Sequence, residues 1–183
     1  MAKMKNLIII WLTLMFVATF ASGLVYIVTQ QSIRLGANEE PMRLATDTKL
    51  KLDGGQNVSA VISSDKVNIN ESLSAFVMIY DKNKKLIATS GMMGSAEPSY
   101  PSGVFDVVAK KGEDRVTWQT ADKHRFASVA IKYNDGYIVA AKSLVESEKL
   151  IDTIGKLVLL AFTAFTICSV VWVIIIRFVI KKS

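Results

Sequence analysis

The chain is poor in the side chains that carry most catalytic and metal chemistry. Its 183 residues include one cysteine, one histidine and three prolines. Because Cys168 is the only cysteine, no disulfide can form within the chain, and Cys168 with His124 cannot supply the paired thiolates and imidazoles of a zinc site. Gly91 and Gly94 lack the lysine and helix start that follow in a phosphate-binding loop. No spacing specifies a serine–lysine hydrolase either, so we expect no enzymatic activity, no cofactor and no metal.

Charge is also absent from two long apolar runs, at residues 7–28 and 157–176. A helix needs about 20 apolar residues to cross the hydrocarbon layer, and both runs reach that length. A charged side chain at mid-helix costs about 2.5–3.5 kcal/mol on insertion scales, and neither run contains one. We therefore predict transmembrane helices at 7–28 and 156–176. A secretory signal core is only about 7–15 residues long, so we interpret the first run as an uncleaved anchor.

Small residues stand four apart in each predicted transmembrane helix. These are Ala18 and Ser22 in the first helix, and Ala164 and Cys168 in the second. Small residues at this spacing let helix backbones approach closely, which predicts helix packing in the membrane through these positions. The alternative is that they carry no role, because small residues are frequent in any transmembrane helix.

Nearly all of the formal net charge of +6 arises at the two ends of the chain. All 16 acidic residues lie between the apolar runs, whereas the flanks carry only basic residues: Lys3, Lys5, Arg177, Lys181 and Lys182. Positively charged flanks stay in the cytoplasm, and long loops cross the membrane largely regardless of charge. We therefore expect cytoplasmic ends at 1–6 and 177–183, and a domain at 29–155 outside the lipid bilayer. That domain is nearly neutral, which argues against nucleic-acid binding.

Turn residues and hydrophobic periodicity predict an α+β domain between the runs. The expected order is a long helix continuing the first transmembrane helix, a helix at 38–54, a short helix or loop at 56–72, strands at 75–80 and 85–90, a loop at 91–101, a helix at 102–112, strands at 115–119, 125–133 and 137–141, and a helix at 144–155. Five short strands with hairpin-length connectors indicate a five-stranded antiparallel sheet. The last helix is expected to run directly into the second transmembrane helix.

The segment FVMIYDKNKKLIATS at residues 76–90, together with the long helix before it, resembles the Cache (PAS-like) sensor domains. These domains flank bacterial histidine kinases and chemoreceptors outside the cytoplasmic membrane, and the similar layout covers about residues 30–155. The segments at 37–41, 101–105, 116–119 and 141–144 resemble small two-span bacterial membrane proteins with no assigned function.

The resemblance implies a sensor that binds a small molecule or a protein outside the cell. Cache-bearing receptors usually continue past the second transmembrane helix into a HAMP linker and a signalling domain, whereas here only residues 177–183 follow. We therefore expect the output to lie in a membrane protein partner, in a homodimer, or in a longer receptor of which this is the input part. The alternative hypothesis is a structural or accessory envelope protein whose outer domain binds another protein and no small molecule.

In a domain of this type, ligands lie between the sheet and the connecting loops. The candidate ligand-binding residues are Tyr80, Trp118, Gln119 and Arg125. Trp118 offers a large apolar plate, and Arg125 offers a planar fork for carboxylates. The alternatives are that Trp118 belongs to the core, that Tyr80 caps the core, and that Arg125 forms an ion pair with Asp114 or Glu113.

Overall fold

The computed structural model describes residues 2–62, 65–120 and 122–182, which divide into two compact units. One unit contains Met1–Ile33 and Lys149–Ser183, and the other contains Arg34–Glu148. The first unit consists of most of α1 (Ala2–Gly36) and most of α5 (Val145–Lys182). The second unit contains the sheet and the remaining helices, so we describe each unit separately.

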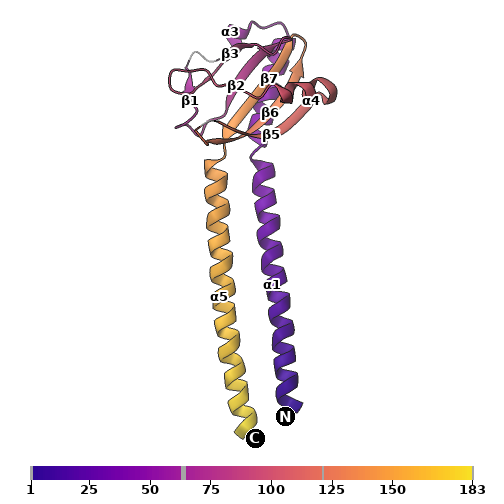
Figure 1. The fold of residues 1–183 in the computed structure, drawn as a ribbon, viewed down its shortest axis with the longest axis vertical. Coiled ribbons are helices and arrows are strands. Elements are labelled where there is room, and N and C mark those ends of the chain that lie inside the picture. The colour runs from indigo at the N-terminus through magenta and orange to yellow at the C-terminus, as the bar shows by residue number, and fades with distance from the viewer. Residues whose placement is uncertain (1, 63–64, 121, 183) are drawn as a thin grey trace. The chain divides into compact units, whose positions relative to one another are not determined.

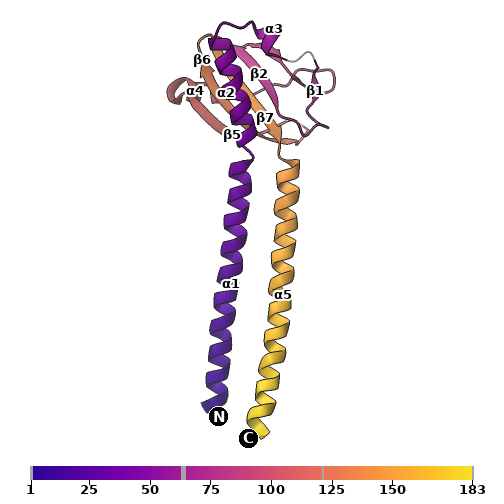
Figure 2. The ribbon, with the colours of Figure 1, turned by 180° about the vertical axis from the view of Figure 1, so that it is seen from behind.

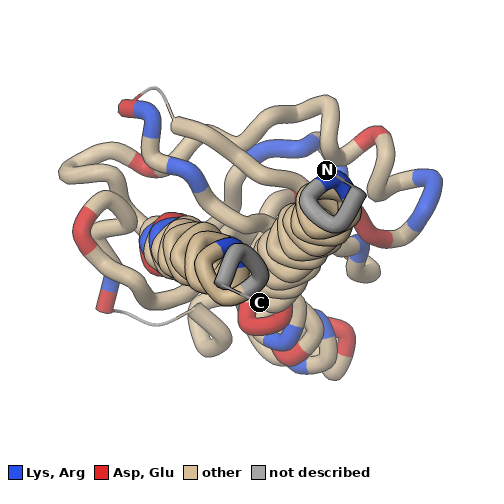
Figure 3. Tube along the Cα trace, turned by 90° about the horizontal axis from the view of Figure 1, so that it is seen from below, with Lys and Arg blue, Asp and Glu red and all other residues tan. Residues whose placement is uncertain are grey.

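Among the described residues, α1 and α5 are long and apolar enough to cross a membrane. No residue in the most hydrophobic 18-residue stretch of either helix is buried, which distinguishes them from the core helices of a soluble protein. Figure 3 shows long stretches of both helices without charged residues, with charged residues near their ends. The predicted continuation of the first helix beyond residue 28 is confirmed, and α5 is the predicted single helix that continues into the second apolar run.

Five antiparallel strands form the sheet of the second unit, in the spatial order β3-β2-β7-β6-β5. The strands are β2 (Phe76–Asp81), β3 (Leu86–Thr89), β5 (Glu113–Gln119), β6 (Arg125–Tyr133) and β7 (Gly136–Ser143). Three pairs are hairpins between consecutive strands, as predicted. The fourth pair joins β2 to β7, with Phe76 opposite Ala141. The α+β class and the five-stranded antiparallel sheet are therefore confirmed, and the PAS-like fold stays a prediction.

One helix covers each face of the sheet (Figures 1 and 2). Helix α2 (Glu39–Asp53) packs on β6 and β7 through Ala45, which is fully buried with Val129 and Ile138. Helix α4 (Gly103–Lys111) packs on β5 and β6 over a larger cluster that contains most of the aromatic side chains of the domain. The sheet is thus buried on both faces, which explains why β6 and β7 have little polar alternation.

Helix boundaries follow the predicted residues, although the capping contacts differ. Asn38 and Ser102 occupy the N-cap positions of α2 and α4, yet neither side chain caps its helix. The Asn38 amide nitrogen instead donates to the Arg34 carbonyl oxygen at 3.2 Å, which closes the turn between α1 and α2. Gly112 ends α4 with φ of 86°, a conformation that favours glycine.

The sequence predicts a short helix or loop before β2, at residues 56–72, and a loop after β3, at residues 91–101. Residues 58–61 form α3 (Val58–Val61), and two-residue strands β1 (Val67–Asn68) and β4 (Gly91–Met92) pair in parallel. The predicted loop at 91–101 therefore begins with a strand. The connector between β5 and β6 includes residue 121, which lies outside the described residues.

Candidate functional site

Tyr80 and Trp118 lie in a buried aromatic cluster between the sheet and α4. Each is 4% exposed. The Tyr80 ring centroid lies 4.8 Å from that of Phe105, and the Trp118 centroid lies 5.5 Å from that of Tyr100. Distances of this size are ordinary aromatic packing contacts, so both side chains belong to the core of the domain.

The two tyrosine hydroxyls in this cluster have different partners. The Tyr100 hydroxyl lies 2.9 Å from Ser128 Oγ, which itself donates to the Val116 carbonyl oxygen. The Tyr80 hydroxyl donates to the thioether sulfur of Met78 at 3.5 Å, a weak acceptor. Burial raises the pKa of Tyr100 to about 12, and burial also raises the pKa of Tyr80 far above its usual value. Both hydroxyls are therefore neutral at physiological pH.

Gln119 and Arg125 form a cross-strand pair at the end of the β5–β6 hairpin. Both side chains are exposed. Since strand residues alternate between faces, they lie on the opposite face of the sheet from Trp118. The structure therefore brings Tyr80 and Trp118 into one buried cluster, whereas Gln119 and Arg125 lie together on the opposite face of the sheet. It does not bring the four candidates into one site, and their role in ligand binding stays a prediction.

The predicted ion pair of Arg125 with Asp114 or Glu113 is wrong. Arg125 Nη1 lies 2.5 Å from Glu148 Oε1, in the first turn of α5. Glu113 instead pairs with Arg115 at 3.3 Å on the same strand. Sequence reasoning missed the Glu148 partner because the contact depends on how α5 leaves the sheet.

Two ion pairs connect the sheet to the first turns of α2 and α5. Lys142 Nζ, near the end of β7, lies 2.6 Å from Glu40 Oε2 in α2, and Arg125 pairs with Glu148 in α5. Lys142 and Arg125 lie on neighbouring strands: Lys142 of β7 is opposite Ala127 of β6, two residues after Arg125. The backbone N–H of Leu144 also donates to the Arg125 carbonyl oxygen at 2.9 Å. The end of β7 and the start of α5 are thus attached to the first residue of β6.

Contacts between α1 and α5 involve only some of the predicted packing residues. Ala18 and Ser22 are half-buried, whereas Ala164 and Cys168 are exposed. The indole N–H of Trp11 donates to Ser169 Oγ at 3.1 Å, a polar contact that joins the two apolar helices. Farther along the pair, Tyr26 lies against Gly155, where an added Cβ would come within 3.2 Å of the tyrosine ring.

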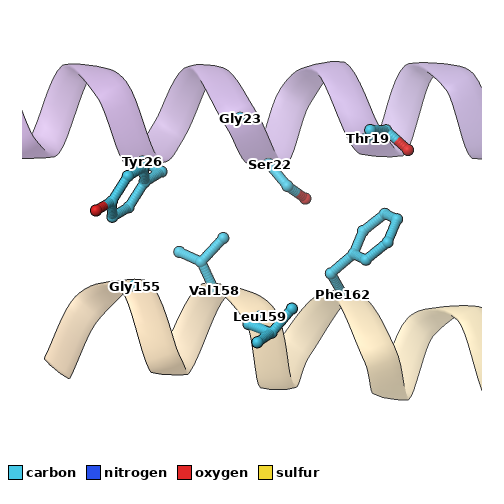
Figure 4. A pocket seen from close by; sticks show the side chains of 8 residues that line it. All are labelled: Thr19, Ser22, Gly23, Tyr26, Gly155, Val158, Leu159 and Phe162. Carbon is cyan, nitrogen blue, oxygen red and sulfur yellow. The ribbon is translucent and has the colours of Figure 1, made fainter. Parts of the chain in front are cut away.

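A hollow of about 410 Å³ opens between these helices beside Tyr26 (Figure 4). Its α1 wall includes Ser22 and Gly23, and its α5 wall includes Val158 and Phe162. Figure 4 shows the side chains of Ser22, Tyr26 and Phe162 directed between the helices. Sequence reasoning identified Ser22 only through its spacing from Ala18, and it missed the hollow.

Within the described residues, no group of three His, Cys, Asp or Glu side chains is arranged to hold a metal ion. Comparisons of the chain with protein-family models, with curated proteins and with solved structures find no match.

Proposed function

We propose that this chain is a sensor or regulatory subunit of the bacterial cytoplasmic membrane. Helices α1 and α5 cross the bilayer, both ends of the chain lie in the cytoplasm, and the domain at residues 29–155 lies outside. The domain binds a small molecule or a protein, and the transmembrane helices transmit the signal to a partner. The basic flanks of the apolar runs and the likeness of the domain layout to Cache sensors support this proposal.

One observation carries the signalling part of the proposal. Only Leu144 separates the end of β7 from the start of α5, and α5 continues without a break into the second apolar run. Leu144 is buried, and its N–H is bonded to Arg125. A movement of β6 or β7 therefore changes the position of the first turn of α5 without a flexible linker to absorb it.

A ligand shifts such an equilibrium only by its difference in affinity for two arrangements of the domain. The Arg125–Glu148 pair favours the arrangement in which the first turn of α5 is held at the start of β6. Its two side chains are 45% and 44% exposed, so it contributes only about 0.2–1 kcal/mol. A contribution of this size is suited to a junction that must change during signalling.

Hydrogen exchange of the full chain in lipid nanodiscs tests this junction. In Glu148→Gln we expect faster exchange at the first turns of α5 and at the start of β6, because both ends of the ion pair are released. Glu146→Gln is the matched control, since Glu146 lies in the same turn, is exposed and removes the same charge. Unchanged exchange in Glu148→Gln, or an equal change in the control, would show that the pair does not couple the sheet to α5.

The packed aromatic cluster favours a second candidate function. Tyr80 and Trp118 each pack against another aromatic ring in the core. In this second candidate the domain binds another protein through its surface, as a structural or accessory envelope protein. Nuclear magnetic resonance of the labelled Met78 methyl group, which lies in this cluster, distinguishes the two candidates. A shift of the Met78 signal on addition of small-molecule extracts supports a sensor of small molecules, whereas an unchanged Met78 signal supports a partner that binds the surface of the domain.

A further inference from the structure

The hollow beside Tyr26 is one of two that share a side chain of α5. Leu159 lines the hollow between the helices and also a second hollow of about 470 Å³ on the adjacent face of α5. The second hollow runs from Lys156 past Leu160 and Thr163 to Ile167. Two apolar hollows thus lie on either side of Leu159 and begin at the same level of the helix.

Polar groups lie at the level where both hollows begin. Lys156 Nζ forms an ion pair with Asp152 Oδ2 at 2.6 Å, and both side chains are largely exposed, at 74% and 62%. The Tyr26 hydroxyl lies near Gly155 on the neighbouring turn. Within the described residues, neither the Tyr26 hydroxyl nor the Ser22 hydroxyl has a hydrogen-bond partner. Tyr26 and Ser22 line the first hollow and Lys156 lines the second, whereas Asp152 lines neither hollow and adjoins them through its ion pair with Lys156.

From this arrangement we infer that α1 and α5 hold one zwitterionic diacyl phospholipid, such as phosphatidylethanolamine. The inference rests on the proposed membrane-spanning role of the two helices. The ammonium group of the lipid lies at Asp152, and its phosphate lies at Lys156. The Tyr26 and Ser22 hydroxyls donate to the ester carbonyl oxygens, and the two acyl chains follow the two hollows along Leu159.

The chemistry of the bilayer favours this occupant. Other hydroxyls of α1 and α5 donate to carbonyl oxygens of their own helix, as Thr19 does to Met15, whereas the Tyr26 and Ser22 hydroxyls are left to donate to an acceptor on the lipid. Charge complementarity then selects the headgroup. An adjacent Asp–Lys pair matches a headgroup with both signs of charge, whereas a purely anionic headgroup would meet the Asp152 carboxylate.

Gly23 provides a variant that fills the first hollow without disturbing the protein. A Cβ added at Gly23 would meet no atom within 4 Å, although Gly23 lines the hollow. Gly23→Leu therefore places a side chain where we expect an acyl chain. Ala21→Leu is the matched control, because Ala21 lies on the same helix, is exposed and does not line the hollow.

Native mass spectrometry of the full chain, released from nanodiscs of equal parts phosphatidylethanolamine, phosphatidylglycerol and phosphatidylcholine, measures the retained lipid. We expect one zwitterionic lipid per chain, phosphatidylethanolamine or phosphatidylcholine, retained in preference to phosphatidylglycerol. We expect its occupancy to fall about three- to tenfold in Gly23→Leu and to be unchanged in Ala21→Leu. The double variant Asp152→Asn, Lys156→Gln keeps the net charge and should abolish the preference among the three headgroups.

Three results would overturn the inference. Unchanged retention in Gly23→Leu would show that the hollow holds no acyl chain. Equal retention of the three lipids by the unmodified chain would remove the headgroup recognition. A second copy of the chain in place of lipid would make the hollow a helix-docking surface. If labelling from outside the cell still places the domain there, these results would refute lipid binding and leave the proposed sensor role standing.

Discussion

At the residue scale, Tyr100 shows how the aromatic cluster connects packing to protonation. Its hydroxyl is 2.9 Å from Ser128 Oγ, and its side chain is only 7% exposed. Burial favours the neutral phenol, so the pKa in the folded domain is about 12 against an ordinary value of 10. The hydrogen bond to Ser128 opposes this shift in part. The unfolded chain therefore releases its proton at a lower pH than the folded chain does.

This difference predicts loss of stability in alkaline solution. The contribution of Tyr100 is fully present below about pH 10 and is lost as the pH rises through 12, at up to about 1.4 kcal/mol per pH unit. In Tyr100→Phe we expect a shallower decline between pH 10 and 12, because the titrating group is absent. Urea unfolding of the chain followed by far-ultraviolet circular dichroism measures the free energy of unfolding at each pH. An unchanged dependence of the free energy of unfolding on pH would show that the titration of Tyr100 does not affect the stability of the domain.

At the scale of elements, turn residues and periodicity predict most helices and strands. Gly112 ends α4 as predicted, and the connectors between consecutive strands specify the hairpins. The parallel pair β1–β4 was missed, because two residues per strand give no measurable alternation. The pairing of β2 with β7 also lies beyond local sequence patterns, because it depends on how the whole sheet closes.

The candidate site is less accessible to sequence reasoning than the fold. Sequence reasoning grouped Trp118 with Gln119 and Arg125, although Gln119 follows Trp118 on the same strand and therefore faces the opposite side of the sheet. Alternation does not identify Glu148 as the partner of Arg125, because that contact joins a strand to a helix through tertiary geometry. The spacing of Ala18 and Ser22 indicates a contact face on the first helix. The hollow also depends on Gly155 of the other helix, because a Cβ added there would lie only 3.2 Å from the Tyr26 ring.

The helix pair predicts a measurable role for one polar contact. In Trp11→Phe the indole donor is lost, and we expect the association of α1 with α5 to weaken by about 0.6–2 kcal/mol. Spin labels attached to Ile9→Cys and Ile175→Cys, in a Cys168→Ser background, report the distance between the two helices by electron paramagnetic resonance. The distribution should broaden in Trp11→Phe. It should stay narrow in Trp172→Phe, whose side chain is 64% exposed, and equal broadening in both would contradict the assignment to the Ser169 contact.

At the scale of the whole molecule, the distribution of charge predicts an orientation. All acidic residues lie between the apolar runs and the flanks are basic, so the domain should lie outside the cell. In a Cys168→Ser background, we expect a membrane-impermeant maleimide to label Gln56→Cys in intact bacteria. Asn6→Cys should be labelled only after the membrane is opened. Both positions are exposed. The reverse pattern would place the domain in the cytoplasm.

The position of β7 at the centre of the sheet has a consequence for biosynthesis. Its neighbours β2 and β6 are both translated earlier, and β2 precedes it by the whole of α4, β5 and β6. The β2–β3 hairpin therefore lacks its neighbouring strand β7 until the ribosome has completed the rest of the domain. When β7 emerges, α5 follows directly behind it. Completion of the sheet and delivery of the second apolar segment to the insertion machinery thus fall within the same short interval of synthesis.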